Sequence, residues 1–255
     1  MSCESQPQHH PQDQQPDVVK GTSHRRQPRS SGRHGWAEVS SHPQTIAKET
    51  HIKIAIIGAG NVGRTLGTAW RDRGHDVTFG VRNPDDPKYA SLDAVQANES
   101  AAAAADVVAL CTPWQGTRQA VQSCGGLAGK VVIDCTNPLT PDFSALETGL
   151  TTSGAEQVAS WAAGARVCKA MNQIGAPMMD GPQVPGKPVM FVCGDDDQAK
   201  SVTAALVSEL GFETVDAGDL TLARLLEPYA LLWIHLALRR GFGTNFAFGL
   251  LRGQS

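Results

Sequence analysis

The stretch that decides the fold is IKIAIIGAGNVG, residues 52–63. An apolar run typical of a β-strand leads into Gly58, Gly60 and Gly63, the Gly-x-Gly-x-x-Gly spacing of a dinucleotide-binding turn. In such a turn the first glycine allows the sharp bend, and the second lets a pyrophosphate approach the backbone. The third lets the following helix pack closely on the strand, and the free N–H groups of that helix face the phosphates. We therefore expect this turn to bind a dinucleotide.

The end of the second expected strand indicates which dinucleotide it is. Residues 79–83 read FGVRN, with Arg82 where an NAD enzyme would carry Asp or Glu. A charge-assisted hydrogen bond to the 2′-phosphate of NADP contributes roughly 1.5–3 kcal/mol, which corresponds to about a ten- to hundredfold preference. We expect NADP rather than NAD, and the alternative is that Arg82 is only a solvated loop residue.

The rest of the chain predicts an α/β fold, a doubly wound Rossmann-type parallel sheet with a small C-terminal helical appendage. Apolar runs alternate with helical patterns from residue 52 onward, which is typical of a sheet with helices on both faces. Gly74 should end the first helix in the left-handed conformation, and Gly67 should let that helix pack closely on the sheet. The expected strands are residues 52–57, 77–80, 107–112, 131–135, 166–171, 189–193 and 212–216. The expected helices are residues 61–73, 197–210 and a helix from 220 onward, with a short helix ending near 105.

Three segments are expected along the chain. Residues 1–50 are rich in Gln, His, Pro and Ser and have little apolar periodicity, which predicts a disordered tail. Residues 51–195 are expected to form the NADP-binding Rossmann domain. Residues 196–255 are expected to form a small C-terminal domain with the acceptor site and a dimer contact. Its apolar run, residues 230–238, is too short to span a membrane, so we expect no membrane span.

Composition excludes several other classes of function. The net charge is −3, and no basic stripe with interleaved aromatics appears, so nucleic acid is not an expected partner. Cys111, Cys135, Cys168 and Cys193 lie in or beside apolar runs, as buried free thiols of a reducing compartment would. The tail lacks the apolar core of a secretory signal, so a cytoplasmic protein is expected. Few histidines lie outside the tail, and no metal site is expected.

Ligands of doubly wound sheets bind outside the carboxyl ends of the strands. Thr112 and Pro113 follow one such end and should lie along the cofactor. Trp114 either flanks the nicotinamide or lies in the core. Residues 137–138 and 171–177 follow two further strand ends, where we expect the second substrate.

No acid–base set stands out, and no catalytic residue is assigned. Lys169 and Asn172 are similar to a pair in hydroxyacid dehydrogenases, but the match is weak because both belong to a strand. His235 lies in an apolar helical pattern, so we expect it to be a buried core histidine. Hydride transfer between nicotinamide and another redox ring needs mainly binding and orientation, so the missing acid and base favour that reaction.

The sequence resembles the NADPH:8-hydroxy-5-deazaflavin oxidoreductase family over residues 52–252. The cytoplasmic reductase domain of the STEAP metalloreductases is similar to the same family. CGDDD and VDAG are the more specific of the shared segments, because generic Rossmann proteins lack them. The shared segments are residues 54–63, 80–84 (GVRNP), 112–114 (TPW), 169–172 (KAMN), 191–196 (FVCGDD), 215–218 (VDAG) and 223–227 (ARLLE).

The resemblance implies a homodimer that binds NADP on the glycine turn, with a deazaflavin, or a flavin in some relatives, stacked on the nicotinamide. Val81 stands where the family often has Ser or Thr, and Asn83 where a second basic residue is common. Both departures remove contacts to the 2′-phosphate. By position, the resemblance assigns Ala59, Gly60, Asn61 and Val62 to the pyrophosphate, Val81 and Arg82 to the 2′-phosphate, and Thr112, Pro113 and Ala176 to the nicotinamide side.

Two other functions remain open from the sequence. One is an NADPH-dependent dehydrogenase or imine reductase of a small substrate, similar to pyrroline-carboxylate reductase. The other is a non-catalytic NADP-sensing module whose tail recruits partners. The small-substrate enzyme predicts NADPH oxidation with a carbonyl or imine compound. The sensing module predicts tight nucleotide binding without turnover.

Overall fold

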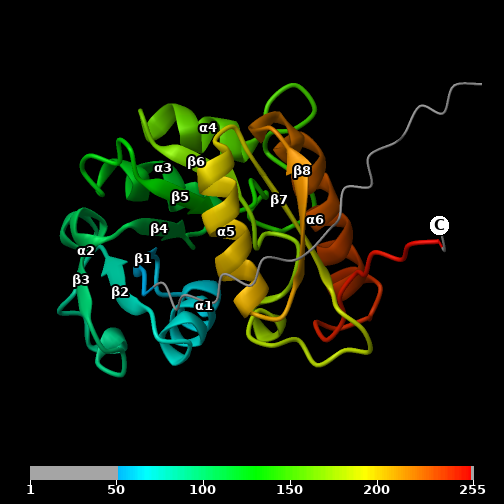
Figure 1. Ribbon diagram of the computed structural model, residues 1–255, viewed down its shortest axis with the longest axis horizontal. Helices are drawn as coiled ribbons and strands as arrows, with labels where there is room; N and C mark the ends of the chain where they lie inside the picture. Colours follow the sequence, from blue (N-terminus) through cyan, green and yellow to red (C-terminus); the bar gives the residue numbers. More distant parts are fainter. Residues whose placement is uncertain (1–50, 254–255) are drawn as a thin grey trace, which may run out of the picture. The chain divides into compact units, whose positions relative to one another are not determined.

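The computed structural model describes residues 51–253 of the 255-residue chain. The tail that was expected to be disordered lies outside the described residues. The described part contains an eight-stranded sheet with the order β3-β2-β1-β4-β5-β6-β7-β8, and β3 and β8 form its two edges (Figure 1). This architecture confirms the expected doubly wound Rossmann-type sheet.

The elements alternate along the chain as the apolar pattern predicts. The strands are β1 (Lys53–Ile57), β2 (Asp76–Val81), β3 (Val95–Ala97), β4 (Val107–Leu110), β5 (Val131–Asp134), β6 (Arg166–Lys169), β7 (Val189–Gly194) and β8 (Glu213–Gly218). The α-helices are α1 (Asn61–Asp72), α2 (Asn98–Ala104), α3 (Trp114–Gln122), α4 (Gly154–Trp161), α5 (Asp197–Glu209) and α6 (Ala223–Arg239). Three short 3₁₀ turns are η1 (Pro87–Tyr89), η2 (Ala176–Met178) and η3 (Leu220–Leu222).

Two apolar clusters cover the two faces of the sheet. Helices α1 and α5 pack on one face, where Leu66 and Leu206 are fully buried, and Figure 1 shows α5 crossing that face. The side chain of Trp70 links these two helices, because its Nε1 donates a hydrogen bond to the carbonyl oxygen of Leu206, 3.0 Å away. Helices α2, α3, α4 and the start of α6 supply the cluster on the other face, which includes Ala101, Val121, Val158 and Leu226.

The sheet differs from the expected one in the direction of β7. Strands β1 to β6 are parallel, but β7 runs antiparallel to β6, and β8 runs parallel to β7. Only Cys168 and Lys169 of β6 pair with β7. Beyond them the side-chain amide of Gln173 takes the place of a neighbouring strand, since it donates to the Phe191 carbonyl at 2.9 Å and accepts from the Phe191 N–H at 3.2 Å.

The C-terminal part continues the same sheet. The boundary expected at residues 195–196 falls between β7 and α5, and β8 beyond it pairs with β7. Helix α6 then packs against α4, and Pro228 lies within it. Among residues 51–253 no helix is both long enough and apolar enough to cross a membrane.

Candidate NADP-binding site

The glycine turn between β1 and α1 has the geometry that its sequence predicts. Gly58 has a φ of +101°, and its N–H donates to the Gly80 carbonyl oxygen at 3.0 Å, which holds the turn against the end of β2. A Cβ on Gly63 would lie 1.9 Å from the carbonyl oxygen of Gly58, so only glycine fits there. A Cβ on Gly67 would lie 2.5 Å from the Phe79 ring, which confirms the expected close packing of α1 on the sheet. At the far end of this helix, Gly74 has a φ of +91°, which confirms the expected left-handed residue.

Open space remains beside Gly60, where the pyrophosphate is expected. A Cβ built on Gly60 would have no atom within 4 Å. Gly60 precedes α1 and accepts the first intrahelical hydrogen bond, from the N–H of Arg64 at 2.9 Å. In the described part of the chain no side chain caps this helix, so its first N–H groups stay available to an anion.

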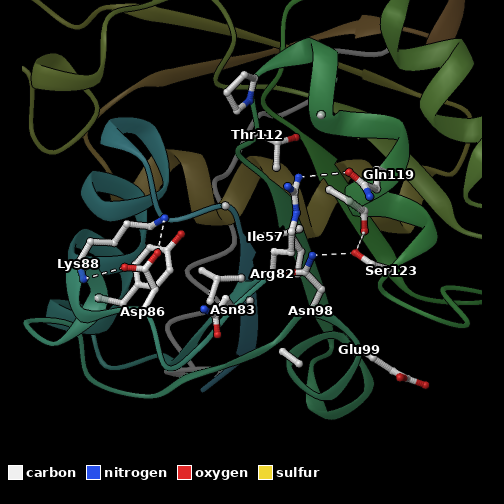
Figure 2. A pocket seen from close by; sticks show the side chains of 18 residues that line it. Ile57, Arg82, Asn83, Asp86, Lys88, Asn98, Glu99, Thr112, Gln119 and Ser123 are labelled. Atoms are coloured by element: carbon white, nitrogen blue, oxygen red, sulfur yellow. Dashed lines mark hydrogen bonds and ion pairs between the residues drawn. The ribbon is translucent and has the colours of Figure 1, made fainter.

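A cavity of about 710 Å³ opens beside the turn, along the carboxyl ends of β1, β2 and β4. Its size lies within the range of small-molecule and cofactor sites. Figure 2 shows the side chains that line it, which come from the ends of these strands, from η1 and from helices α2 and α3. Its lining residues include Gly58, Gly80, Val81, Arg82, Asn83, Asp86, Lys88, Asn98, Glu99, Thr112, Pro113, Gln119, Ala120 and Ser123.

Arg82 reaches across this cavity. Its Nη2 donates to Oε1 of Gln119 on α3, 3.2 Å away, and both side chains are exposed (Figure 2). The guanidinium therefore joins the end of β2 to α3 on the side where the 2′-phosphate of NADP is expected. The role of Arg82 at the 2′-phosphate stays a prediction.

A second charged pair, Asp86 and Lys88, lines the same cavity. Their Oδ2 and Nζ atoms lie 2.7 Å apart (Figure 2). The hydrogen bond from Lys88 lowers the pKa of the Asp86 carboxyl, and the same contact raises the pKa of Lys88. Neither residue was predicted from the sequence, because both follow β2 in a loop with no fixed spacing. Lys88 brings a second cation to the cavity, although Asn83 stands where the second basic residue of the family is common.

Arg64 of α1 connects the turn to this loop. Its Nε donates to the carbonyl oxygen of Ala59 at 2.9 Å, and its Nη2 donates to the carbonyl oxygen of Lys88 at 2.9 Å. The glycine turn and the loop that carries Lys88 are therefore held together by one side chain.

Some of the site residues that were predicted from the sequence line the cavity. Gly58, Val81, Arg82, Thr112 and Pro113 line it. The other turn residues, positions 59–63, are not among its lining residues, and their place along the pyrophosphate stays a prediction. Ala176 is half-buried at the start of η2, lies outside the lining of this cavity, and packs against the core on the α1 face. Its predicted place beside the nicotinamide stays a prediction.

Lys169 belongs to a buried ionic cluster. Its Nζ lies 2.9 Å from Oδ2 of Asp134, 2.9 Å from Oε1 of Glu227 and 2.6 Å from the carbonyl oxygen of Thr136. These two carboxylates raise the pKa of Lys169 although burial alone would lower it. The second oxygen of Glu227 accepts the N–H of Gly154 at 2.9 Å, so the cluster also caps α4. Lys169 is thus a structural residue and has no free proton to donate.

Three further residues considered from the sequence are also structural or exposed. Asn172 donates to Oδ1 of Asn137 at 3.1 Å and to the carbonyl oxygen of Leu226 at 3.2 Å, which ties the ends of β5 and β6 to α6. Trp114 packs against Trp161, with ring centroids 5.5 Å apart, which supports the core interpretation. The prediction of a core histidine is wrong: His235 is exposed, because Ala230, Trp233 and Ala237 form the buried face of α6.

The cysteines of the described residues are free and buried, as expected. Burial raises the pKa of Cys124 and Cys168 to about 11 and that of Cys193 to about 12, so these thiols stay protonated at neutral pH. Within residues 51–253 no group of three or more His, Cys, Asp or Glu side chains is arranged to hold a metal ion.

Comparison with known proteins identifies the family. The family model described as "NADP oxidoreductase coenzyme F420-dependent" matches residues 53–138. The F420-dependent NADP reductase of Methanocaldococcus jannaschii is 26% identical over 209 residues, which cover 74% of this chain and 93% of that protein. A crystal structure from Arthrobacter sp. FB24, provisionally described as an F420-dependent NADP reductase, is 33% identical. It covers 79% of this chain and 100% of its own, with a TM-score of 0.73.

The Metalloreductase STEAP3 of Rattus norvegicus is 29% identical over 181 residues, which cover 70% of this chain. The chain spans 36% of that protein's length. The full-length match to the Arthrobacter structure, together with the glycine turn, shows the family. The chain therefore belongs to the coenzyme F420-dependent NADP oxidoreductase family and is an NADP-dependent oxidoreductase.

Proposed function

We propose that this chain transfers hydride between NADP(H) and a deazaflavin or flavin-like coenzyme. The observation that carries the proposal is the commitment of Lys169 to Asp134 and Glu227. Reduction of a small carbonyl or imine calls for a positioned proton donor, and this lysine is fully buried and ion-paired. Hydride exchange with a redox ring needs mainly binding and orientation.

In this proposal the chain's own residues bind and orient the nicotinamide cofactor, which supplies the hydride. Gly60, with its open side, and the first N–H groups of α1 bind the pyrophosphate. Arg82 and Lys88 bind the 2′-phosphate. The remaining assigned residues are Gly58, Ala59, Asn61, Val62 and Gly63 along the phosphates, Val81 at the ribose, and Thr112, Pro113 and Ala176 on the nicotinamide side.

The proposal extends to the C-terminal segment, residues 196–255, as the acceptor wall and dimer contact of a cytoplasmic homodimer. Helix α6 exposes Leu225 by 63% and Leu232 by 50%, which lie seven residues apart and therefore on one side of the helix, and it exposes Leu238 by 61% near its end. A second copy of the chain would cover these side chains. Light scattering of the purified protein tests this part. A monomer at micromolar concentration contradicts it.

The central experiment mixes the purified full chain, NADPH and oxidised 8-hydroxy-5-deazaflavin, and follows the absorbance of both coenzymes. We expect the two signals to fall together, with one NADPH oxidised for each deazaflavin reduced. A parallel reaction contains FMN in place of deazaflavin, and another contains a cyclic imine.

Each other outcome identifies a different function. Turnover with the cyclic imine, and none with the deazaflavin or FMN, would establish the small-substrate reductase. Tight NADPH binding, measured by fluorescence, without turnover in any reaction would support the NADP-sensing module. Failure to bind NADPH would overturn the proposal as a whole.

A further inference from the structure

Two free thiols lie side by side at the carboxyl ends of β4 and β5. The parallel register of these strands pairs Leu110 with Asp134. The N–H of Cys135 donates to the Leu110 carbonyl oxygen at 3.1 Å, so the ladder continues to Cys111 and Cys135, which directly follow the two strands. Both side chains belong to the apolar cluster on the face that α1 and α5 cover. Cys111 and Cys135 are therefore neighbours on one face of the sheet.

This spacing suits a disulfide bond. Neighbouring strands lie about 4.8 Å apart, and the Cα atoms of disulfide-bonded cysteines lie about 4.4–6.8 Å apart. The two thiols also affect each other, because the Cys111 thiol, and after it burial, raise the pKa of Cys135. A rotation of the two side chains can therefore bring the sulfur atoms together while the strands keep their register.

The other cysteines of residues 51–253 have no such neighbour. Cys168 and Cys193 lie on the adjacent strands β6 and β7, but their side chains belong to the clusters on opposite faces of the sheet. Both are fully buried, and Cys124 is 2% exposed. Cys111 and Cys135 are 8% and 7% exposed. A small oxidant therefore reaches this pair more readily than the other thiols.

The backbone of Cys111 also lies against the glycine turn. A Cβ on Gly58 would lie 2.9 Å from the carbonyl oxygen of Cys111 and 3.0 Å from Cγ2 of Thr112. Thr112 in turn lines the cavity (Figure 2). A bond that draws Cys111 toward β5 therefore moves the backbone beside both the turn and the cavity.

We infer that Cys111 and Cys135 are a modification site, where a peroxide forms a reversible disulfide that weakens the binding of NADPH. The effect on NADPH rests on the proposed cofactor site, whereas formation of the disulfide does not. The two parts of the inference therefore have separate measurements.

The reaction consumes one peroxide molecule and two thiols. The sulfur of Cys111, which precedes the cavity-lining Thr112, attacks one peroxide oxygen and breaks the O–O bond. This step leaves a sulfenic acid and releases one water. The sulfur of Cys135 then attacks the sulfenic sulfur, forms the S–S bond and releases the second water, which carries away its proton. The two sulfurs are oxidised, the peroxide is reduced, and a dithiol reductant reverses the bond by exchange.

The test for the disulfide treats the purified full chain with a small excess of hydrogen peroxide and digests it with trypsin without reductant. Trypsin separates the cysteines of this region, because it cuts after Arg118 and Lys130. We expect mass spectrometry to find residues 89–118 linked to residues 131–166, with the loss of two hydrogen atoms. Dithiothreitol should return both peptides to free thiols. If this linked peptide is absent, the inference is overturned.

Fluorescence titration then compares NADPH binding by the reduced, the oxidised and the re-reduced protein after removal of the peroxide. We expect the oxidised protein to bind NADPH about tenfold more weakly, and dithiothreitol to restore the affinity. An unchanged affinity in protein that carries the disulfide would overturn the inferred effect on binding. If the reduced protein does not bind NADPH either, the proposed function fails, and the mass measurement still decides whether the disulfide forms.

Variants assign the effect to this pair. Cys135→Ser and Cys111→Ser each remove one partner, and we expect neither the linked peptide nor a reversible loss of NADPH affinity. Cys124→Ser, at a buried thiol without such a neighbour, is the matched control and should respond to peroxide as the wild type does. A reversible loss of wild-type size in Cys135→Ser would show that another modification weakens binding, and it would overturn the inference.

Discussion

Glu227 of α6 and Lys169 of β6 form an ion pair whose Oε1 and Nζ atoms lie 2.9 Å apart, and neither side chain is exposed to solvent. Asp134 of β5 completes the cluster on the other side of the ammonium group. The N–H groups of Gly154 and Ala155 point at Glu227 from the start of α4. One buried cation thus joins two strands and two helices.

Replacing Lys169 with Met should destabilise the protein strongly. The substitution leaves two carboxylates buried without their cation, which costs about 3–5 kcal/mol in comparable pairs. Urea denaturation followed by circular dichroism measures the free energy of unfolding. Lys53→Met, at an exposed lysine of β1, is the matched control. A loss of less than about 1 kcal/mol in Lys169→Met would argue against an energetically important cluster.

Gly60→Ala and Gly63→Ala should separate cofactor binding from folding. A methyl group on Gly60 meets no protein atom, so stability should stay at the wild-type level while it fills the space of the pyrophosphate. NADPH affinity should fall by about tenfold or more. Gly63→Ala places its methyl group against the Gly58 carbonyl and should lower both stability and binding. Thermal melts and NADPH fluorescence measure the two effects, and unchanged binding in Gly60→Ala would contradict the assigned pyrophosphate position.

Arg82→Ala should weaken the binding of NADPH far more than the binding of NADH. The lost charge-assisted contact predicts roughly a ten- to hundredfold weaker NADPH complex. NADH lacks the 2′-phosphate and should bind almost as before. Dissociation constants for both nucleotides provide the check. Equal losses for the two would mean that Arg82 supports the fold or the base and not the phosphate.

Asp86→Asn should tighten NADPH binding by a few-fold, an increase typical of removing one repulsive charge near a surface. The amide keeps the hydrogen bond from the Lys88 N–H that Asp86 accepts at the start of η1, and it frees the Lys88 side chain for the phosphate. Asp85→Asn, beside it and outside the cavity lining, serves as the control. Competition between NADPH and NADH reports the change, and a shift of equal size in both variants would point to general charge and not to Lys88.

The ion pair between Glu156 of α4 and Arg224 of α6 should give stability an acid dependence. The hydrogen bonds from Arg224, at 2.9 and 2.6 Å, hold the pKa of Glu156 below its ordinary value of 4.5. The unfolded chain therefore binds this proton more readily. The stabilisation is complete above the ordinary pKa and disappears as the pH falls through the lowered one.

Urea denaturation at several pH values between about 6 and 3 measures this dependence. Glu156→Gln should flatten the acid slope, whereas Glu147→Gln, at an exposed loop residue, should leave it unchanged. An acid slope that is the same in Glu156→Gln and the wild type would exclude this pair as its source.

The sequence predicted the order of elements where apolar runs and glycines impose it. The turn at Gly58, the left-handed Gly74 and the close contact at Gly67 all follow from local sterics. Strand β3, residues 95–97, was missed because it is short and mostly exposed, so no apolar run marks it. The reversed direction of β7 was also missed. The prolines in residues 170–188 argue against a helix in this connection, and the structure forms only a 3₁₀ turn there. A parallel connection usually needs a helix there.

The candidate site could be predicted from the sequence only at residues that directly follow the end of a strand. Gly58, Arg82, Thr112 and Pro113 follow strand ends, and the topology places those ends together. Asp86, Lys88, Asn98, Gln119 and Ser123 come from loops and helices whose spacing carries no signal. Their convergence depends on how α2 and α3 pack on the sheet.

Arg64 donates hydrogen bonds to the carbonyl oxygens of Ala59 and Lys88. The glycine turn and the loop that contains η1 therefore cannot move independently of each other. An engineer who wishes to convert the enzyme to NADH cannot graft that loop from another protein in isolation. A shorter or longer loop would pull on Arg64 and move the backbone that holds the pyrophosphate. Point substitutions within the existing loop are the route to a changed cofactor that keeps this anchor in place.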